Sequence, residues 1–102
     1  MSDTQMRVAC SLTETELRER RGVLLEKAGR AVLESKELPD GFAYRFPEGD
    51  EWLEELTHII RLERRCCPFL GFRLLVEPGD GPVWLELTGP PGTKEFLASL
   101  FV

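Results

Sequence analysis

Two short segments near the C-terminus constrain the fold more than any other part of the chain. Residues 72–76 and 83–87 carry an apolar residue at every second position, and the turn-forming sequence Pro-Gly-Asp-Gly-Pro separates them. Alternation of this kind is typical of a strand with one buried face. The tight connection predicts an antiparallel hairpin, and its apolar face needs other elements to cover it.

The remaining segments provide candidates for that cover. Residues 6–12 alternate and predict a first strand, with Cys10 on its inner face. Thr13 and Glu16 match a capping box, which predicts a helix start, and the helix is expected to continue to about Lys36. Residues 42–46 predict a second strand, and a helix is expected from an N-cap at Asp50 to Cys66. A short helix is expected after the Pro-Pro-Gly-Thr sequence at 90–93.

The predicted order is therefore β-α-β-α-β-β-α in a single α+β domain over residues 1–102. We expect a two-layer sandwich, in which two long helices cover one face of a four-stranded mixed sheet. In the last strand Trp84 points to the opposite side of the hairpin from Val83, Leu85 and Leu87. If the helices cover only one face, either Trp84 or these aliphatic side chains are left to solvent or to a partner. A homodimer through the sheet is one expectation from this pattern.

The predicted second long helix has an unusual residue on its apolar face. At 100° per residue with Leu56 at zero, Ile59 falls at about −60°, Leu53 at about 60° and Glu63 at about −20°. A buried carboxylate requires a partner, and the candidates are Arg20 or Arg21, the Tyr44 hydroxyl, or a metal ion. The alternative is that Glu63 lies at a frayed helix end and reaches water along its stem.

Two adjacent cysteines follow this carboxylate. Cys66 falls at about −80° and Cys67 at about 20° on the same wheel, and Pro68 should push Cys67 out of the helix. If the strand that carries Cys10 ends beside them, three sulfurs could meet and form a metal site with Glu63 as a further ligand or proton acceptor. The alternative is that the cysteines act as small apolar core residues.

Composition excludes several classes of function. The formal charge of −5 and the mixed charge pattern disfavour a nucleic-acid partner. No segment approaches the about 20 apolar residues that span a bilayer, and the N-terminus has no export signal, so a cytoplasmic protein is expected. Three cysteines in such a chain argue for free thiols, metal ligands or redox groups rather than a structural disulfide framework.

The chain resembles a group of small bacterial proteins with a Glu-x-x-Cys-Cys-Pro/Ser-Phe core. The resemblance covers most of the chain through the segments "ACSL", "LRERR", "GFAYRF" and "LERRCCPFLGFRLLVEPGDGPVWLELTGPPGTKEFL". Proteins of this group are often encoded among mercury-resistance and other metal-responsive genes. The resemblance implies the handling of a thiophilic metal or metalloid, and its motif points to Cys10, Glu63, Cys66 and Cys67.

Three functions are therefore open. The first is binding of a soft metal or metalloid (Hg, Zn, Cu or As) by the thiols, which predicts two sulfurs within about 4 Å of each other. The second is a thiol/disulfide redox protein, in which one cysteine attacks and the other resolves. The lack of a His partner for the thiols disfavours an enzyme. The third is a non-catalytic protein-interaction domain with inert, buried cysteines.

Overall fold

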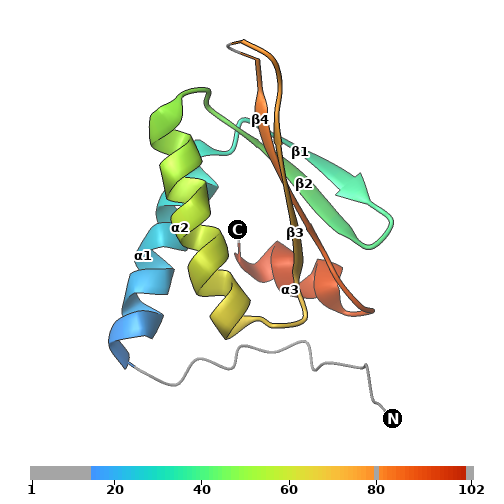
Figure 1. Ribbon diagram of the computed structural model, residues 1–102. Helices are drawn as coiled ribbons and strands as arrows, with labels where there is room; N and C mark the ends of the chain where they lie inside the picture. The colour runs from blue at the N-terminus through green and yellow to red at the C-terminus, as the bar shows by residue number, and fades with distance from the viewer. Residues whose placement is uncertain (1–14, 80, 101–102) are drawn as a thin grey trace.

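The computed structural model describes residues 15–79 and 81–100, and Figure 1 shows their arrangement. They form an α+β fold with three helices and a four-stranded sheet. None of these helices combines the length and apolar character that crossing a membrane requires. In chain order the elements are α1 (Thr15–Ala31), β1 (Glu34–Leu38), β2 (Gly41–Phe46), α2 (Asp50–Cys66), β3 (Gly71–Val76), β4 (Val83–Thr88) and α3 (Thr93–Leu100).

The four described strands are all antiparallel to their neighbours, in the order β1-β2-β4-β3. The predicted hairpin is confirmed, because β3 and β4 pair with Phe72 opposite Leu87 and Val76 opposite Val83. The expectation of a mixed sheet is wrong for this sheet, since every pair is antiparallel. The strand predicted at residues 6–12 lies outside the described residues.

The first helix is shorter than predicted. It ends at Ala31 instead of near Lys36, and β1 occupies much of the remaining segment. The sequence of β1, ESKEL, is rich in residues that favour helices, but its backbone groups pair with β2 from Glu34 opposite Arg45 to Leu38 opposite Gly41. Sheet pairing overrides the local helix propensity here.

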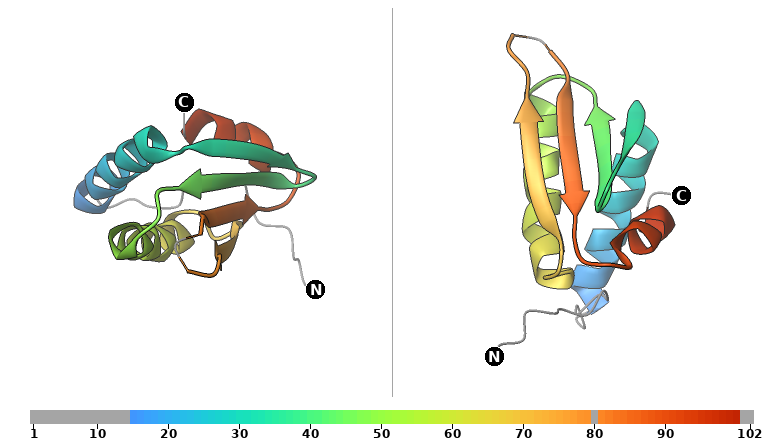
Figure 2. Two further views of the ribbon diagram at one scale, coloured as in Figure 1. Left: turned by 90° about the horizontal axis from the view of Figure 1, so that it is seen from above. Right: turned by 90° about the vertical axis from the view of Figure 1, so that its right-hand side faces the viewer.

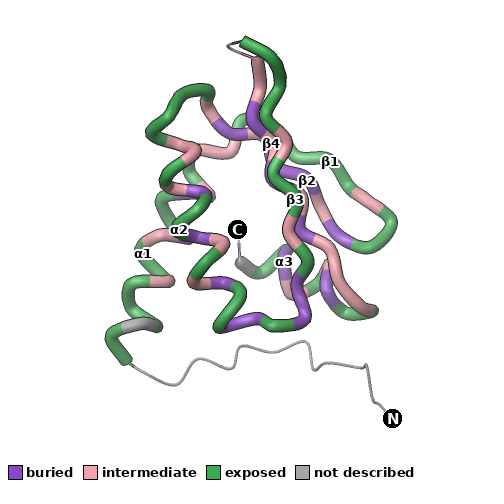
Figure 3. The backbone as a smooth tube through the Cα atoms, in the orientation of Figure 1, coloured by how far each residue is buried: buried purple, intermediate pink, exposed green. Residues whose placement is uncertain are grey.

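The core lies between the sheet and the two long helices. In the right-hand view of Figure 2 the strands lie in front, with α1 and α2 behind them. Val83, Leu85 and Leu87 are buried and belong to one core cluster with Leu56 and Ile59 of α2. Figure 3 shows the buried parts of the backbone in purple. Complete burial of a side chain such as Leu56 contributes about 2 kcal/mol relative to an exposed one.

Trp84 belongs to the opposite face of the sheet. Its ring is partly buried, and the ammonium of Lys36 in β1 lies 4.6 Å from the ring centroid. The two long helices therefore cover the aliphatic side chains of β4 and leave Trp84 on the other face of the sheet. A cation at this distance over an indole face is attracted by the ring electrons.

Candidate functional site

The C-terminal half of α2 positions the acidic residue that the sequence pattern singled out. The buried residues of α2 are Leu56, Ile59, Glu63 and Cys66, which share one face at helical spacing. Glu63 is only 2% exposed, so the alternative in which it reaches water along its stem is wrong. The predicted start of this helix needs a smaller correction, because the N-cap is Gly49, with φ of 118°, and not Asp50.

Arg21 of α1 is the partner of Glu63. Its Nε donates a hydrogen bond to Glu63 Oε2 at 2.6 Å, and its Nη2 donates one to Oε1 at 3.2 Å. This bidentate geometry is the strong form of a carboxylate–guanidinium pair. The Arg21 side chain is 15% exposed and that of Glu63 is 3% exposed, so the pair is largely shielded from water.

The chain leaves the helix immediately after Cys66, as Pro68 predicts. Cys67 is the C-cap residue, with φ of −127° and ψ of 75°, and its N–H still donates to the carbonyl of Glu63. The N–H of Leu70 then donates to the carbonyl of Cys67 at 3.0 Å, which closes a tight turn before β3. Phe69 lies within this turn and is buried, and its ring meets that of Phe96 in α3 edge to face, with the centroids 5.1 Å apart.

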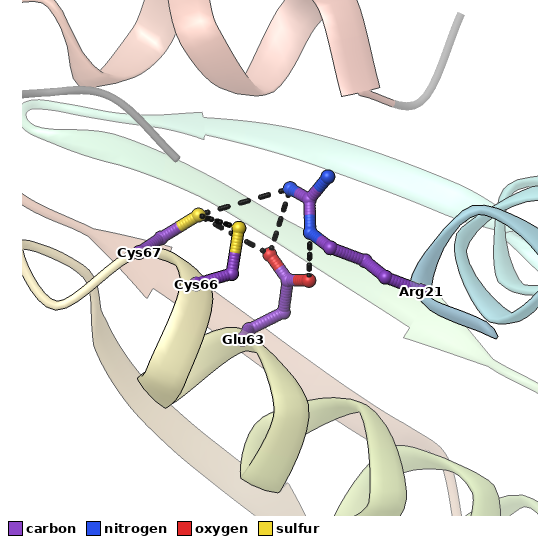
Figure 4. Close-up of polar contacts among 4 residues, drawn as sticks. All are labelled: Arg21, Glu63, Cys66 and Cys67. Atoms are coloured by element: carbon purple, nitrogen blue, oxygen red, sulfur yellow. Dashed lines mark hydrogen bonds and ion pairs between the residues drawn. The ribbon is translucent and has the colours of Figure 1, made fainter. Parts of the chain in front are cut away.

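The turn brings the sulfur of Cys67 into contact with three polar groups (Figure 4). The Cys67 thiol donates to Glu63 Oε1 at 3.6 Å, Arg21 Nη2 lies 3.7 Å from Cys67 Sγ, and the sulfurs of Cys66 and Cys67 are 3.4 Å apart. Both cysteines are completely buried. Cys67 is a free thiol, whereas Cys66 is disulfide-bonded.

The surroundings hold Cys67 in its protonated form. Burial, together with the negative charge of Glu63, raises the pKa of the Cys67 thiol to about 12, although Arg21 acts in the opposite direction. Burial alone would lower the pKa of Arg21, but the hydrogen bond and charge of Glu63 outweigh it, and the pKa is raised. A thiol with a raised pKa differs from the activated thiolates of cysteine enzymes, whose pKa is lowered.

The structure brings together three of the four predicted site residues, Glu63, Cys66 and Cys67. Cys10, the fourth, lies outside the described residues. Within the described part of the chain, no group of three or more His, Cys, Asp or Glu side chains is arranged to hold a metal ion. Arg21 belongs to the same cluster, and the sequence indicated it only as one of several possible partners of Glu63.

The chain was also compared with known proteins. No protein-family model, curated protein or solved structure matches it.

Proposed function

We propose that this protein binds a soft metal ion or metalloid, with Hg²⁺ and Zn²⁺ as the first candidates, through Cys66 and Cys67 in their reduced form. The observation that carries the proposal is the 3.4 Å distance between the two sulfurs. Two thiolates on one tetrahedral Zn²⁺, each with a bond of about 2.3 Å, lie about 3.8 Å apart. A movement of a few tenths of an ångström would therefore bring both sulfurs onto one ion.

The neighbours of Cys67 suit the chemistry of such a site. The thiol must lose its proton when a metal binds, and Glu63 Oε1, which already accepts the Cys67 hydrogen bond, is the nearest described proton acceptor. Arg21 then lies beside the new thiolate, and its positive charge offsets the negative charge of the sulfurs. The disulfide at Cys66 has to be reduced before the ion can enter.

The finer parts of this proposal rest on the sequence. Cys10 is the proposed third sulfur, because the chain has no other cysteine to complete a trigonal thiolate site. The resemblance to proteins encoded among mercury-resistance genes favours Hg²⁺ and a role in metal sensing, buffering or delivery inside the cell.

A titration of the fully reduced protein tests the proposal. Hg²⁺ and then Zn²⁺ are added while thiolate-to-metal absorption and intact mass under native conditions are followed. We expect one ion per chain, and affinity at least about 100-fold weaker in Cys66→Ser and in Cys67→Ser, because each loses a metal–sulfur bond. A weaker affinity in Cys10→Ser would assign the third sulfur.

His58→Gln is the matched control. His58 is a possible metal ligand on the exposed side of α2, so its loss should leave the stoichiometry and affinity unchanged. Binding that is indifferent to both Cys66→Ser and Cys67→Ser would contradict the proposal.

A specific observation favours a second candidate function, thiol–disulfide exchange. The free sulfur of Cys67 lies 3.4 Å from the sulfur of Cys66, which is itself disulfide-bonded. In such an exchange the Cys67 thiol gives its proton to Glu63, and the thiolate attacks the Cys66 sulfur. A Cys66–Cys67 disulfide forms, and the sulfur previously bonded to Cys66 leaves as a thiolate, with no net oxidation.

Thiol counting in graded glutathione buffers separates the two functions. Redox exchange predicts that the number of alkylated thiols per chain changes reversibly. It also predicts that mass spectrometry detects a peptide that contains the Cys66–Cys67 disulfide. This disulfide-containing peptide should be absent in Cys67→Ser. If no such peptide forms at any glutathione potential, the exchange candidate fails, and the metal titration is unaffected by that result.

A further inference from the structure

A second feature lies on the outer side of the two long helices. There α1 and α2 border a hollow of about 610 Å³ that the cysteine cluster does not use. Two of its lining residues come from α1 and the others from the C-terminal half of α2: Arg20, Leu24, His58, Arg61, Leu62, Arg64 and Arg65. None of the described residues that line this hollow is acidic, and we call the hollow the arginine groove.

Three arginines of this groove, Arg20, Arg61 and Arg64, differ from four arginines outside it. Arg21, Arg30, Arg45 and Arg73 each form an ion pair with a carboxylate of the protein.

By contrast, no carboxylate of residues 15–79 or 81–100 forms an ion pair with Arg20, Arg61 or Arg64. In a chain with a formal charge of −5, these three positive charges line one hollow, and none has an ion-pair partner among the described carboxylates. Like charges placed close together repel, and an anion bound between them would relieve that repulsion.

The geometry of the groove also defines the size of the ligand. Its volume falls within the range of small-molecule sites, and Leu24 and Leu62 provide apolar wall that reduces contact with water. Guanidinium groups bind carboxylates and phosphates through paired hydrogen bonds, and several of them converging on one space suit a ligand with more than one anionic group.

We propose that the arginine groove binds a small anion with two or more carboxylate or phosphate groups. The ligand is a small molecule rather than a nucleic acid, because the formal charge of −5 disfavours a polyanion and the hollow has the volume of a small-molecule site. The proposal does not depend on the metal site, since Arg21, Glu63, Cys66 and Cys67 are not among the described residues that line the groove.

Calorimetric titration tests this proposal with two probes, citrate for the carboxylate class and inorganic pyrophosphate for the phosphate class. At low ionic strength we expect saturable binding of at least one probe with one site per chain. The affinity should fall as salt is added, because the groove is open to solvent. The probe that binds more tightly identifies which of the two anionic groups the groove prefers.

Variants assign the binding to the groove. Arg20→Gln/Arg61→Gln removes two of its guanidinium groups, and we expect the affinity to fall at least about tenfold, because each lost charge-assisted hydrogen bond weakens binding. Both side chains are exposed, so the variant should fold, and the single variant Arg61→Gln is a further check.

Arg30→Gln/Arg73→Gln is the matched control. It removes the same net charge at two exposed positions outside the groove, so its affinity should stay within about twofold of wild type. Failure of both probes to bind, or equal weakening in the groove variant and the control, would overturn the proposal.

Discussion

Glu63 lies on a helix face that is otherwise apolar, and its place there depends on Arg21. The two side chains share two hydrogen bonds and are largely shielded from water. A buried ion pair often gives little net stability relative to an apolar pair, but removal of one partner leaves a buried charge without compensation. The pair therefore makes the fold sensitive to single substitutions at these positions.

Arg21→Met is expected to lower the free energy of unfolding by about 3 kcal/mol, because Glu63 loses its counter-ion in a buried place. Urea unfolding measures the change. Arg18→Met, at an exposed position of the same helix, is the control and should stay within about 0.5 kcal/mol of wild type. Arg21→Met/Glu63→Leu should regain most of the loss, and a cost below about 1 kcal/mol for Arg21→Met alone would contradict this account.

Cys67 should react slowly while the protein is folded. Its sulfur is completely buried and its pKa is raised to about 12, so little thiolate exists at neutral pH. We expect alkylation of Cys67 by iodoacetamide in the reduced, folded protein to be at least about 100-fold slower than in the protein unfolded by guanidinium. Peptide mass spectrometry gives both rates, and similar rates in the two states would show that the thiol is accessible.

Among the described elements, no helix covers the face of the sheet that carries Trp84. The strand register puts two ion pairs on this face, between Arg45 and Glu34 and between Arg73 and Glu86, together with the Lys36–Trp84 contact. These contacts satisfy charged groups within one chain, and they make this face more polar than a typical dimer core. A homodimer through the sheet stays a prediction.

The close approach of β2 and β4 depends on a glycine. A Cβ atom at Gly41 would lie 1.8 Å from the carbonyl oxygen of Leu87, so any side chain there must displace the backbone of β4. Gly41→Ala is expected to lower the free energy of unfolding by about 3 kcal/mol, measured by urea unfolding.

Gly22 in α1 provides the opposite case. A Cβ atom there meets no atom within 4 Å, and alanine favours the helical backbone, so Gly22→Ala should stabilise the protein by about 0.5 to 1 kcal/mol. If Gly41→Ala leaves stability unchanged or raises it, the close contact between β2 and β4 does not have the effect inferred for it.

For the whole molecule, burial of two weak acids makes stability fall at high pH. Burial raises the pKa of both Cys67 and Tyr44 to about 12, whereas ordinary values are about 8.5 for a thiol and about 10 for a phenol. At a pH between the unfolded and the folded pKa of each group, the folded state holds more protons than the unfolded state. The stabilisation from each group is complete below its unfolded pKa and is lost as the pH rises toward 12.

We expect the free energy of unfolding to fall from about pH 8.5 upward, with a slope of up to about 1.4 kcal/mol per pH unit for each group. Urea unfolding between pH 8 and 11 measures the slope. Cys67→Ala should show a shallower decline from the lower end of this range, because one of the two acids is gone. Identical slopes in the variant and the wild type would contradict the raised pKa of Cys67.

The sequence alone determined the parts of this protein that depend on local periodicity. Spacing within about twenty residues predicts four of these features. They are the buried face of α2, the central position of Glu63 on it, the departure of Cys67 from the helix and the β3–β4 hairpin. Side-chain direction along a helix or strand is fixed by backbone geometry, so these features could be predicted before any tertiary contact was known.

Only the tertiary structure decided where α1 ends and which side chain neutralises Glu63. The segment of β1 favours a helix by composition, and its pairing with β2 outweighs that preference. Arg20 and Arg21 are adjacent on α1, yet Arg21 meets Glu63 across 42 positions of sequence, while Arg20 lines the outer groove. Adjacent residues of a helix point about 100° apart. The orientation of α1 against α2 decides which of the two arginines faces Glu63, and packing between residues far apart in the chain sets that orientation.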